Sequence, residues 1–466
     1  IISLAKGIVT LKQLESLYLN GANIGNDDGH SLNILVEALS NKTFLHTFDF
    51  LPQWSLGSPS LQTRITFPAN LIDSINHALK MTNVTLPITQ GLTSPERIQQ
   101  YLAFFPSHTS LLNFSTLFNA KTSAETFSSL MQGLGSFQSL TTLDLSNNNL
   151  GQNAQGIEAL GIGFVFTSQL EQLILNNNTL GALEMSSAKE FAQGLEQLQN
   201  LKKLHLSNNQ LNSFSQSQTV LDVLALNGLQ FLTRLETINL SCPSNNLIPL
   251  PTAGLAVALK QLTQLLQLDF SFCTIALSLT TERRIQVEHL MATLGKLRKL
   301  EDLNLESNIL KPVGFELAAS LKLLINLRFL NLKGNYFFGK SCESIGKNLN
   351  AMRSLKKLNL ASNNWGGDSI YSNRYLHILG NSLAKLVNLS SFDIRFNLIG
   401  FTGINETNLL AHGLTQKAQL TELLFFPQTN KLIQYDFSSY KLLYDAYNHP
   451  NSLKIMSFGA LADFLQ

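Results

Sequence analysis

The sequence has few cysteines, little charge and no uninterrupted apolar segment long enough to cross a membrane. Its 466 residues include three cysteines, and charged residues make up 14% of the chain. An odd and sparse set of cysteines is not a disulfide framework, and a net charge of +2 argues against a strongly basic nucleic-acid-binding protein. The longest uncharged stretch, residues 98–120, is interrupted by Pro106 and His108, so we predict no transmembrane segment.

Motifs of the common enzyme classes are also missing. The chain has no GxxxxGK[ST] phosphate loop, no GxSxG nucleophile motif, no HExxH zinc motif and no CxxC pair. We therefore expect a protein that is not an enzyme. We assign it no catalytic residue, no metal-binding residue, no cofactor-binding residue and no cofactor.

What the sequence has instead is a leucine pattern that recurs along the chain. The segments 140–150, 170–180 and 201–211 each fit LxxLxLxxNxL. The sixth position of this pattern can be placed fifteen times, at spacings of 27 to 36 residues, which leaves room for a strand, a loop and a helix of about 10–12 residues. These sixth positions are Leu19, Phe50, Leu86, Phe114, Leu145, Leu175, Leu206, Leu240, Phe270, Leu305, Leu332, Leu360, Ile394, Phe425 and Phe458.

Each position in the repeat has a predicted role. The fourth and sixth residues alternate as in a short strand, so both face the interior, whereas the third, fifth, seventh and eighth face the opposite surface. Apolar residues spaced three and four apart, such as Leu317, Leu321 and Leu324, predict a helix that closes the unit. The ninth-position asparagines should stack as a hydrogen-bonded ladder. They are Asn148, Asn178, Asn209, Asn308, Asn335, Asn363 and Asn397.

The pattern resembles the ribonuclease-inhibitor type of leucine-rich-repeat protein, in which every strand is followed by a helix. This resemblance implies an α/β solenoid, or horseshoe, with a concave parallel β-sheet of about fifteen strands and helices on the convex side. We predict a single solenoid over 1–466, with N-terminal repeats at 1–43 and degenerate repeats with longer loops at 44–120. Regular repeats follow at 121–425, and 426–466 forms a last repeat and a cap that includes an aromatic-rich helix at 435–447.

The cysteines bear on compartment and on chemistry. Extracellular proteins of this repeat class usually have cysteine-rich end caps, and their absence here predicts a reducing intracellular compartment. Cys242 and Cys273 follow consecutive strands. They are either a redox-sensitive pair, half of a metal site, or small residues that fill turn positions. Cys342 is predicted to lie on a helix.

The predicted function is non-enzymatic binding of another protein on the concave face, by a chain that we expect to be a monomer with no specific nucleic-acid partner. The C-terminal third places large apolar side chains beside charges at outward positions, which is typical of a binding hot spot. The predicted contact residues are Asp302, Glu306, Phe329, Lys333, Lys357, Asp393, Arg395, Phe396, Leu424 and Phe426.

Two further observations bear on the biological setting. Residues 281–400 carry 17 Lys and Arg against 9 Asp and Glu, an excess that could steer an acidic partner or an anionic membrane. Abundant Asn, Ser, Gln and Phe with imperfect repeats resemble effectors that bacteria secrete into the host cytosol. The alternatives are a substrate-recruiting repeat domain of a larger enzyme, such as a ubiquitin ligase, and a secreted immune-receptor ectodomain.

Overall fold

The structure is a computed structural model of the whole chain, and it describes residues 109–397 apart from short internal gaps. The gaps are residue 116 and residues 212–218, 244–248, 278–279 and 367–371. Outside 109–397 it describes two helices, five strands and a few neighbouring residues. The chain divides into two compact units, Ile1–Leu201 and Lys202–Gln466, which are described separately below.

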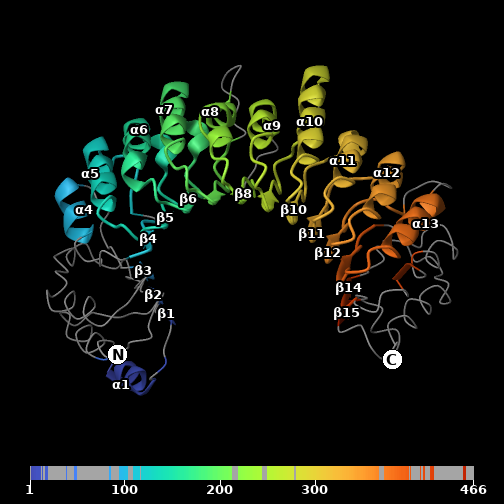
Figure 1. Cartoon of the computed structure of the whole chain (residues 1–466), viewed down its shortest axis with the longest axis horizontal. Coiled ribbons are helices and arrows are strands. Elements are labelled where there is room, and N and C mark those ends of the chain that lie inside the picture. Colours follow the sequence, from blue (N-terminus) through green and yellow to red (C-terminus); the bar gives the residue numbers. More distant parts are fainter. Residues whose placement is uncertain are drawn as a thin grey trace, which may run out of the picture. The chain divides into compact units, whose positions relative to one another are not determined.

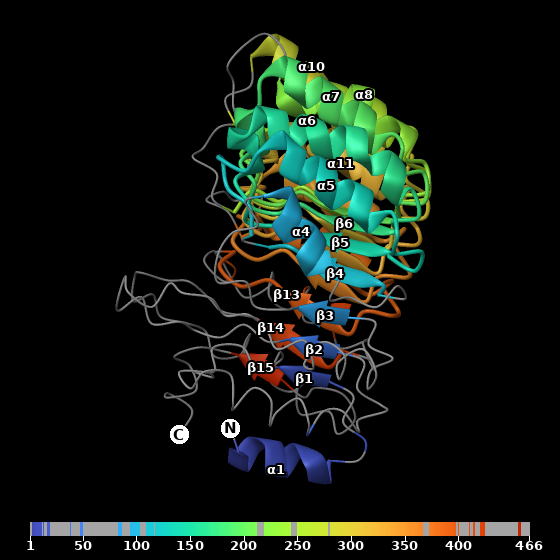
Figure 2. The ribbon, with the colours of Figure 1, turned by 90° about the vertical axis from the view of Figure 1, so that its left-hand side faces the viewer.

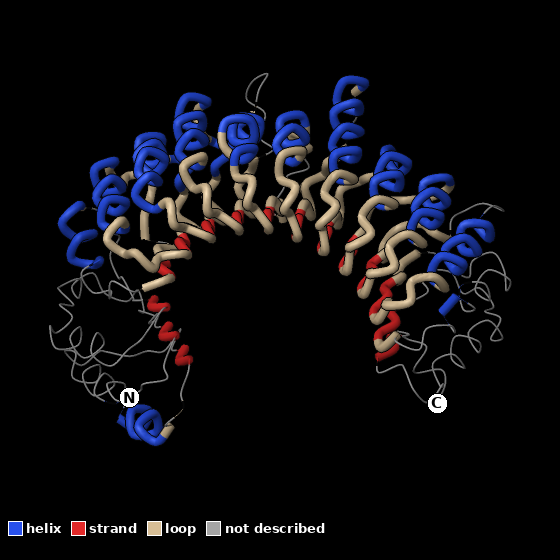
Figure 3. The backbone as a smooth tube through the Cα atoms, viewed as in Figure 1, coloured by secondary structure: helices blue, strands red, loops and turns tan. Residues whose placement is uncertain are grey.

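The first unit is a parallel sheet in which strands pair in chain order, with helices on one face (Figures 1 and 3). Its strands are β1 (Ser16–Tyr18), β2 (Thr47–Asp49), β3 (Asn83–Thr85), β4 (Leu111–Asn113), β5 (Thr142–Asp144) and β6 (Gln172–Ile174). Its helices are α1 (Ile2–Thr10), α4 (Pro95–Leu102), α5 (Ala124–Leu134), α6 (Ala154–Gly163) and α7 (Met185–Leu195), with 3-10 turns at Leu150–Gln152, Phe164–Thr167 and Leu180–Ala182. Figure 2 shows α4 to α7 side by side along this unit.

The second unit repeats the same plan. Its strands are β7 (Lys203–His205), β8 (Thr237–Asn239), β9 (Gln267–Asp269), β10 (Asp302–Asn304), β11 (Phe329–Asn331), β12 (Lys357–Asn359), β13 (Ser391–Asp393), β14 (Glu422–Leu424) and β15 (Ile455–Ser457). Its helices are α8 (Val220–Asn227), α9 (Ala253–Leu259), α10 (Thr281–Leu294), α11 (Gly314–Leu321), α12 (Lys340–Leu349) and α13 (Ser372–Leu383), with 3-10 turns at Leu229–Phe231 and Lys311–Val313. Among the described helices, none is long and apolar enough to span a bilayer.

All fifteen predicted strand positions are confirmed, because each strand ends directly before one of the predicted sixth positions. The middle residue of each described strand with resolved burial is buried and its two neighbours are more exposed. The first, fourth and sixth residues of the repeat form the core between sheet and helices. Leu140, Leu143 and Leu145, for example, are fully buried. We call the sheet face opposite the helices the open face, and it carries the third and fifth residues of each repeat.

The asparagine ladder is also confirmed, since all seven ninth-position asparagines are buried. In the first unit, the backbone N–H of Asn148 donates to Oδ1 of Asn178 at 2.8 Å. In the second unit, Asn308 donates in the same way to Asn335, and Asn335 to Asn363, both at 3.0 Å. The amides of Asn178, Asn335 and Asn363 therefore connect one repeat to the next while satisfying buried backbone groups.

The seventh and eighth positions depart from the prediction that both lie on the open face. Seventh-position residues with small side chains, such as Ser146, Ser271 and Ala361, are buried. The eighth residue lies in the turn beyond the strand and has a left-handed backbone, as at Asn147 (φ 60°) and Asn177 (φ 56°). The two-residue periodicity of a strand therefore stops at the sixth position.

Several predictions concern residues outside the described ones. They include the helix at 435–447, the contact residue Phe426, and the ninth positions of two degenerate repeats, where Gln53 and Thr89 replace asparagine in the sequence. The single solenoid over 1–466 and its internal boundaries stay predictions.

Candidate protein-binding face

Register brings the predicted contact residues of β10–β12 into one row on the open face. Asp302 pairs with Phe329, and Phe329 pairs with Lys357, in the parallel ladders of β10–β11 and β11–β12. The row continues to Ser391 of β13 and Glu422 of β14. Because strands in a sheet lie about 4.8 Å apart, an acid, an aromatic ring and a base occupy three successive steps.

Phe329 and Lys357 interact at the centre of this row. The Nζ atom of Lys357 lies 5.5 Å from the centroid of the Phe329 ring, which is within the range of a cation–π contact. Lys357 is exposed and Phe329 is half-buried. The pair gives the open face an apolar surface with a positive charge beside it.

Asp302 is the acidic end of the same row and is half-buried. Burial, and then the negative charge of Asp269 on the neighbouring strand, raise the pKa of Asp302 above its ordinary value. A carboxylate in this position is stabilised by any cation that approaches it, so Asp302 favours a basic group on a partner.

A second row holds an ion pair. Lys333 and Glu306 occupy seventh positions of neighbouring repeats, and Lys333 Nζ lies 2.8 Å from Glu306 Oε1. The other carboxylate oxygen of Glu306 accepts from Asn331 Nδ2 at 3.0 Å. Both residues were predicted as contact residues, and the structure shows that their side chains form an ion pair with each other.

Arg395 and Asp393 form a bidentate pair within one repeat. Nε of Arg395 donates to Oδ1 of Asp393 at 3.0 Å, and Nη2 donates to Oδ2 at 2.7 Å. The hydrogen bonds that Arg395 donates to Asp393 raise the pKa of Arg395 above its ordinary value. Asp393 is only 6% exposed, so it positions the guanidinium and is itself poorly accessible to a partner.

The fifth-position Asn and Asp residues have a structural role that sequence reasoning missed. Their side-chain oxygens accept the backbone N–H two residues further on, as Asp144 does from Ser146 at 2.9 Å and Asn331 from Lys333 at 3.1 Å. The same bond forms at Asp269, Asn304, Asn359 and Asp393. These side chains therefore hold the strand-to-turn geometry. The recurrence of Asn and Asp at one repeat position was the available signal.

The remaining predicted contact residues lie apart from the central row. Leu424 is half-buried on β14, in register with Asp393. Phe396 is an eighth-position residue, so it lies in the turn after β13 with φ of 59°. Phe426 lies outside the described residues.

Apart from Phe396, the exposed aromatic residues described at the turns were not predicted. Phe272 has the same left-handed conformation as Phe396, and both are more than a third exposed. Tyr336 and Phe338 are also exposed. The Nζ atom of Lys311 lies 3.6 Å from the Phe338 ring centroid. Bulky residues are unfavourable in left-handed turns. Counting the eighth position as a turn residue would have placed Phe272 and Phe396 there, whereas Tyr336 and Phe338 are the tenth and twelfth residues of their repeat.

Cys242 and Cys273 are brought together, as their positions after consecutive strands suggested. Both are buried, and their sulfurs are 2.8 Å apart. Cys273 stands at a ninth position and its Sγ donates to the carbonyl of Leu240 at 3.2 Å, which is the contact that a ladder asparagine makes. Burial, and then the hydrogen bond with Cys242, raise the pKa of the Cys273 thiol. Within the described ranges, no three His, Cys, Asp or Glu side chains gather as a metal site.

These repeats define the fold. In each unit the fold is that of a leucine-rich-repeat solenoid. The Leucine Rich Repeat family model matches residues 139–160 and 200–220, which include two of the three most regular repeats. No curated protein matches the sequence.

Two solved structures are similar to the chain. One is the leucine-rich repeat-containing protein LegL7 from Legionella pneumophila, at 19% identity and a TM-score of 0.40, over 73% of this chain and 97% of that one. The other is TLR13 in a TLR13–ssRNA13 complex, at 18% identity and a TM-score of 0.41 over 97% of this chain. The chain spans 62% of the length of that second structure.

Proposed function

We propose that this protein is a non-enzymatic scaffold that binds another protein on the open face of β10–β14. The observation that carries the proposal is the row Asp302–Phe329–Lys357, in which a half-exposed aromatic ring lies between opposite charges. Aromatic side chains flanked by charged groups are the usual centres of binding energy at protein interfaces. In both units the described helices cover the other face of the sheet (Figure 3), so they leave this row accessible.

The charges beside the row are already held in position. Lys333 is fixed by Glu306, and Arg395 by two hydrogen bonds to Asp393. A partner that meets these groups has less side-chain entropy to remove than it would with freely rotating lysine and arginine side chains. The proposed partner is a protein that presents an apolar group to Phe329, an acidic group to Lys357 and a basic group to Asp302.

The finer proposal is that the partner belongs to a host cell and that the chain is a bacterial effector acting in a reducing cytosol. It is supported by composition, namely many Asn, Ser, Gln and Phe residues with only 14% charged residues. The three described cysteines are all buried and unpaired by disulfides, which is compatible with a reducing compartment.

The test is a matched pair of double variants. After capture of a partner from host-cell lysate, its affinity for purified wild type, F329A/K357A and F315A/K340A is measured by calorimetry. Phe315 and Lys340 are exposed on the helix side of the same repeats, so they control for loss of one aromatic ring and one lysine. Because hot-spot truncations cost about 2 kcal/mol or more each, F329A/K357A should weaken binding by roughly a thousandfold.

The control should bind as the wild type does. Equal affinity of F329A/K357A and wild type would place the interface elsewhere. A larger loss in F315A/K340A would move it to the helix side.

A further inference from the structure

The turns that lead from helices back into strands β10–β13 are rich in basic residues. These four seven-residue turns together hold eight Lys and Arg residues and one Glu. The equivalent turns before β5–β8 hold two basic and three acidic residues. The four basic turns are 295–301, 322–328, 350–356 and 384–390, and the four others are 135–141, 165–171, 196–202 and 230–236. Basic residues are therefore much denser in the turns before β10–β13 than in those before β5–β8.

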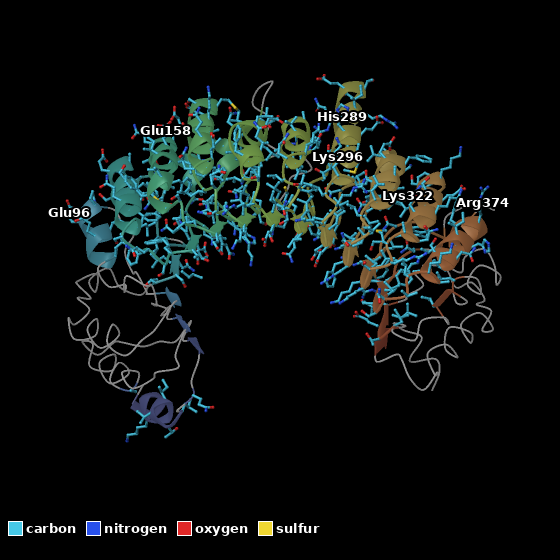
Figure 4. The ribbon with its side chains drawn as sticks, viewed as in Figure 1. Glu96, Glu158, His289, Lys296, Lys322 and Arg374 are labelled. Atoms are coloured by element: carbon cyan, nitrogen blue, oxygen red, sulfur yellow. The ribbon has the colours of Figure 1, made fainter. Side chains whose placement is uncertain are left out.

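The four basic turns stack directly on one another. Nη1 of Arg298 donates to the carbonyl of Leu323 at 2.8 Å. The next contact is from the backbone N–H of Lys356 to the carbonyl of Arg328, at 2.8 Å, and Asn388 Nδ2 then donates to the carbonyl of Arg353 at 2.9 Å. Figure 4 labels Lys296 and Lys322 on two successive repeats. We call this surface the basic edge, and its basic residues are Lys296, Arg298, Lys299, Lys322, Arg328, Arg353, Lys356 and Lys385.

The charge of the basic edge is not neutralised by its own acids. Glu301, the one acid in these turns, pairs with Arg328 at 3.2 Å. Lys299 is held by an uncharged group, Oε1 of Gln264. All eight basic residues are exposed to solvent. The edge therefore presents a strong positive potential to whatever approaches it.

Exposed aliphatic side chains lie among these cations. Leu323 and Ile325 are on the turn before β11, and Val387 is on the turn before β13. Ile325 is 57% exposed and Val387 60%, so they contribute little to the core. Leu323 lies close to Gly295 of the preceding turn, since a Cβ on that glycine would be 3.1 Å from Leu323 Cδ1.

We propose that the basic edge docks on an anionic lipid surface, with the lysines and arginines on headgroups and Ile325 and Val387 in the acyl boundary. Lysines and arginines bind negatively charged membrane surfaces, and neighbouring aliphatic groups add affinity by insertion. An acidic protein or a nucleic acid would use the charges but would leave the protruding aliphatic side chains in water. Contact residues with nucleic-acid bases are typically aromatic, and these turns present aliphatic ones.

Docking through this edge leaves the proposed protein-binding face accessible. The basic turns precede the strands, whereas Phe329 and Lys357 project from the open face of β11 and β12. A membrane-docked molecule could therefore hold a protein partner at the same time. Failure of lipid binding would leave the protein-binding proposal untouched, because the two surfaces share no residue.

The test measures binding of the purified full chain to vesicles by co-sedimentation. One set of vesicles is phosphatidylcholine alone and the other contains phosphatidylserine as well. Since each lysine near an anionic surface contributes about fivefold in affinity, K322A/K356A/K385A should bind the anionic vesicles roughly a hundredfold more weakly. The control K121A/K189A/K340A removes the same charge from exposed positions elsewhere and should lose far less.

A second variant separates lipid from other anions. I325S/V387S keeps every charge, so it should bind soluble polyglutamate as the wild type does but bind anionic vesicles about tenfold more weakly. Equal binding to both vesicle types, or equal loss in the two triple variants, would overturn the proposal. Vesicle binding unaffected by I325S/V387S would also overturn it, because the aliphatic side chains would then add nothing to a purely electrostatic attraction.

Discussion

Replacement of Asn335 by alanine tests the asparagine ladder at its centre. Asn335 is fully buried. Its Nδ2 donates to the carbonyls of Leu305 and Leu332, at 2.8 and 3.0 Å. Its Oδ1 accepts the backbone N–H groups of Asn308 and Leu310, at 3.0 and 3.3 Å. The N335A variant removes all of these bonds without altering the repeats' apolar residues.

The cost of this change falls mainly on the two N–H groups. The carbonyl of Leu305 keeps a donor in Asn308 Nδ2, and that of Leu332 keeps one in Asn363 Nδ2. The N–H groups of Asn308 and Leu310 lose the one acceptor that they have among the described residues. An orphaned buried donor costs about 1–3 kcal/mol, so N335A should lower the free energy of unfolding by about 2–6 kcal/mol.

The measurement is urea denaturation followed by circular dichroism, with hydrogen exchange of the segment 305–313 read by mass spectrometry. N326A is the control, because Asn326 makes a comparable amide-to-carbonyl bond to Arg298 at 2.8 Å but is exposed. It should cost less than about 1 kcal/mol. The reasoning fails if N335A costs no more than N326A, or if the amides of Asn308 and Leu310 keep their protection from exchange.

Three other changes test separate features. G194A should destabilise the first unit, because a Cβ there would lie 2.2 Å from the backbone oxygen of Gly161 and overpacking costs about 1–3 kcal/mol. In the control G133A, the new Cβ meets only the flexible end of the Leu102 side chain. The melting temperature of G133A should therefore be well above that of G194A. D393A should lower stability more than D393N. The asparagine of D393N can still accept the backbone N–H of Arg395 through its amide oxygen, whereas alanine loses both that bond and the ion pair. Equal denaturation midpoints of the two variants would contradict a capping role for Asp393. Burial raises the pKa of the Cys273 and Cys342 thiols, so a thiol-reactive dye should react slowly with native protein and quickly in urea. The thiols of the unfolded chain ionise at a lower pH than the buried ones, so the free energy of unfolding should fall as pH rises above about 8.5. The decrease should be up to about 1.4 kcal/mol per pH unit for each thiol. A urea denaturation midpoint that does not change with pH would refute this.

The strands and the ladder could be predicted from sequence because they depend on burial. In a stacked repeat the fourth position must be apolar and the ninth must satisfy backbone groups of the turn. Leu143 and Asn148 are examples of the two positions. The pattern is therefore visible even where single repeats are imperfect. The strand of Thr47–Asp49 was placed correctly although its repeat has Gln53 where others have asparagine.

The contacts of the candidate site were less predictable because they depend on neighbours in adjacent repeats. Lys333 and Glu306 are 27 positions apart in the chain. The repeat places both at seventh positions, but the side-chain conformations that bring Lys333 Nζ to 2.8 Å from Glu306 Oε1 are seen only in the structure. The turn conformation at Phe396 was missed for a different reason. In other repeats an asparagine at the eighth position suggests a left-handed backbone, because asparagine adopts that conformation readily. Phenylalanine at position 396 gives no such indication.

The fifth-position residues stabilise the fold, whereas the third-position residues are available to contact a partner. Asn331 and Asp393 face the open surface, yet their side-chain oxygens are bound to the backbone two residues later. A change at these positions would alter the strand end before it altered any partner contact. The third-position row makes no such bond to the turn, so Asp302, Phe329 and Lys357 can change without loss of the repeat. Specificity for a partner should therefore be encoded in the third position, and exchange of those residues between repeats should transfer binding while leaving stability nearly unchanged.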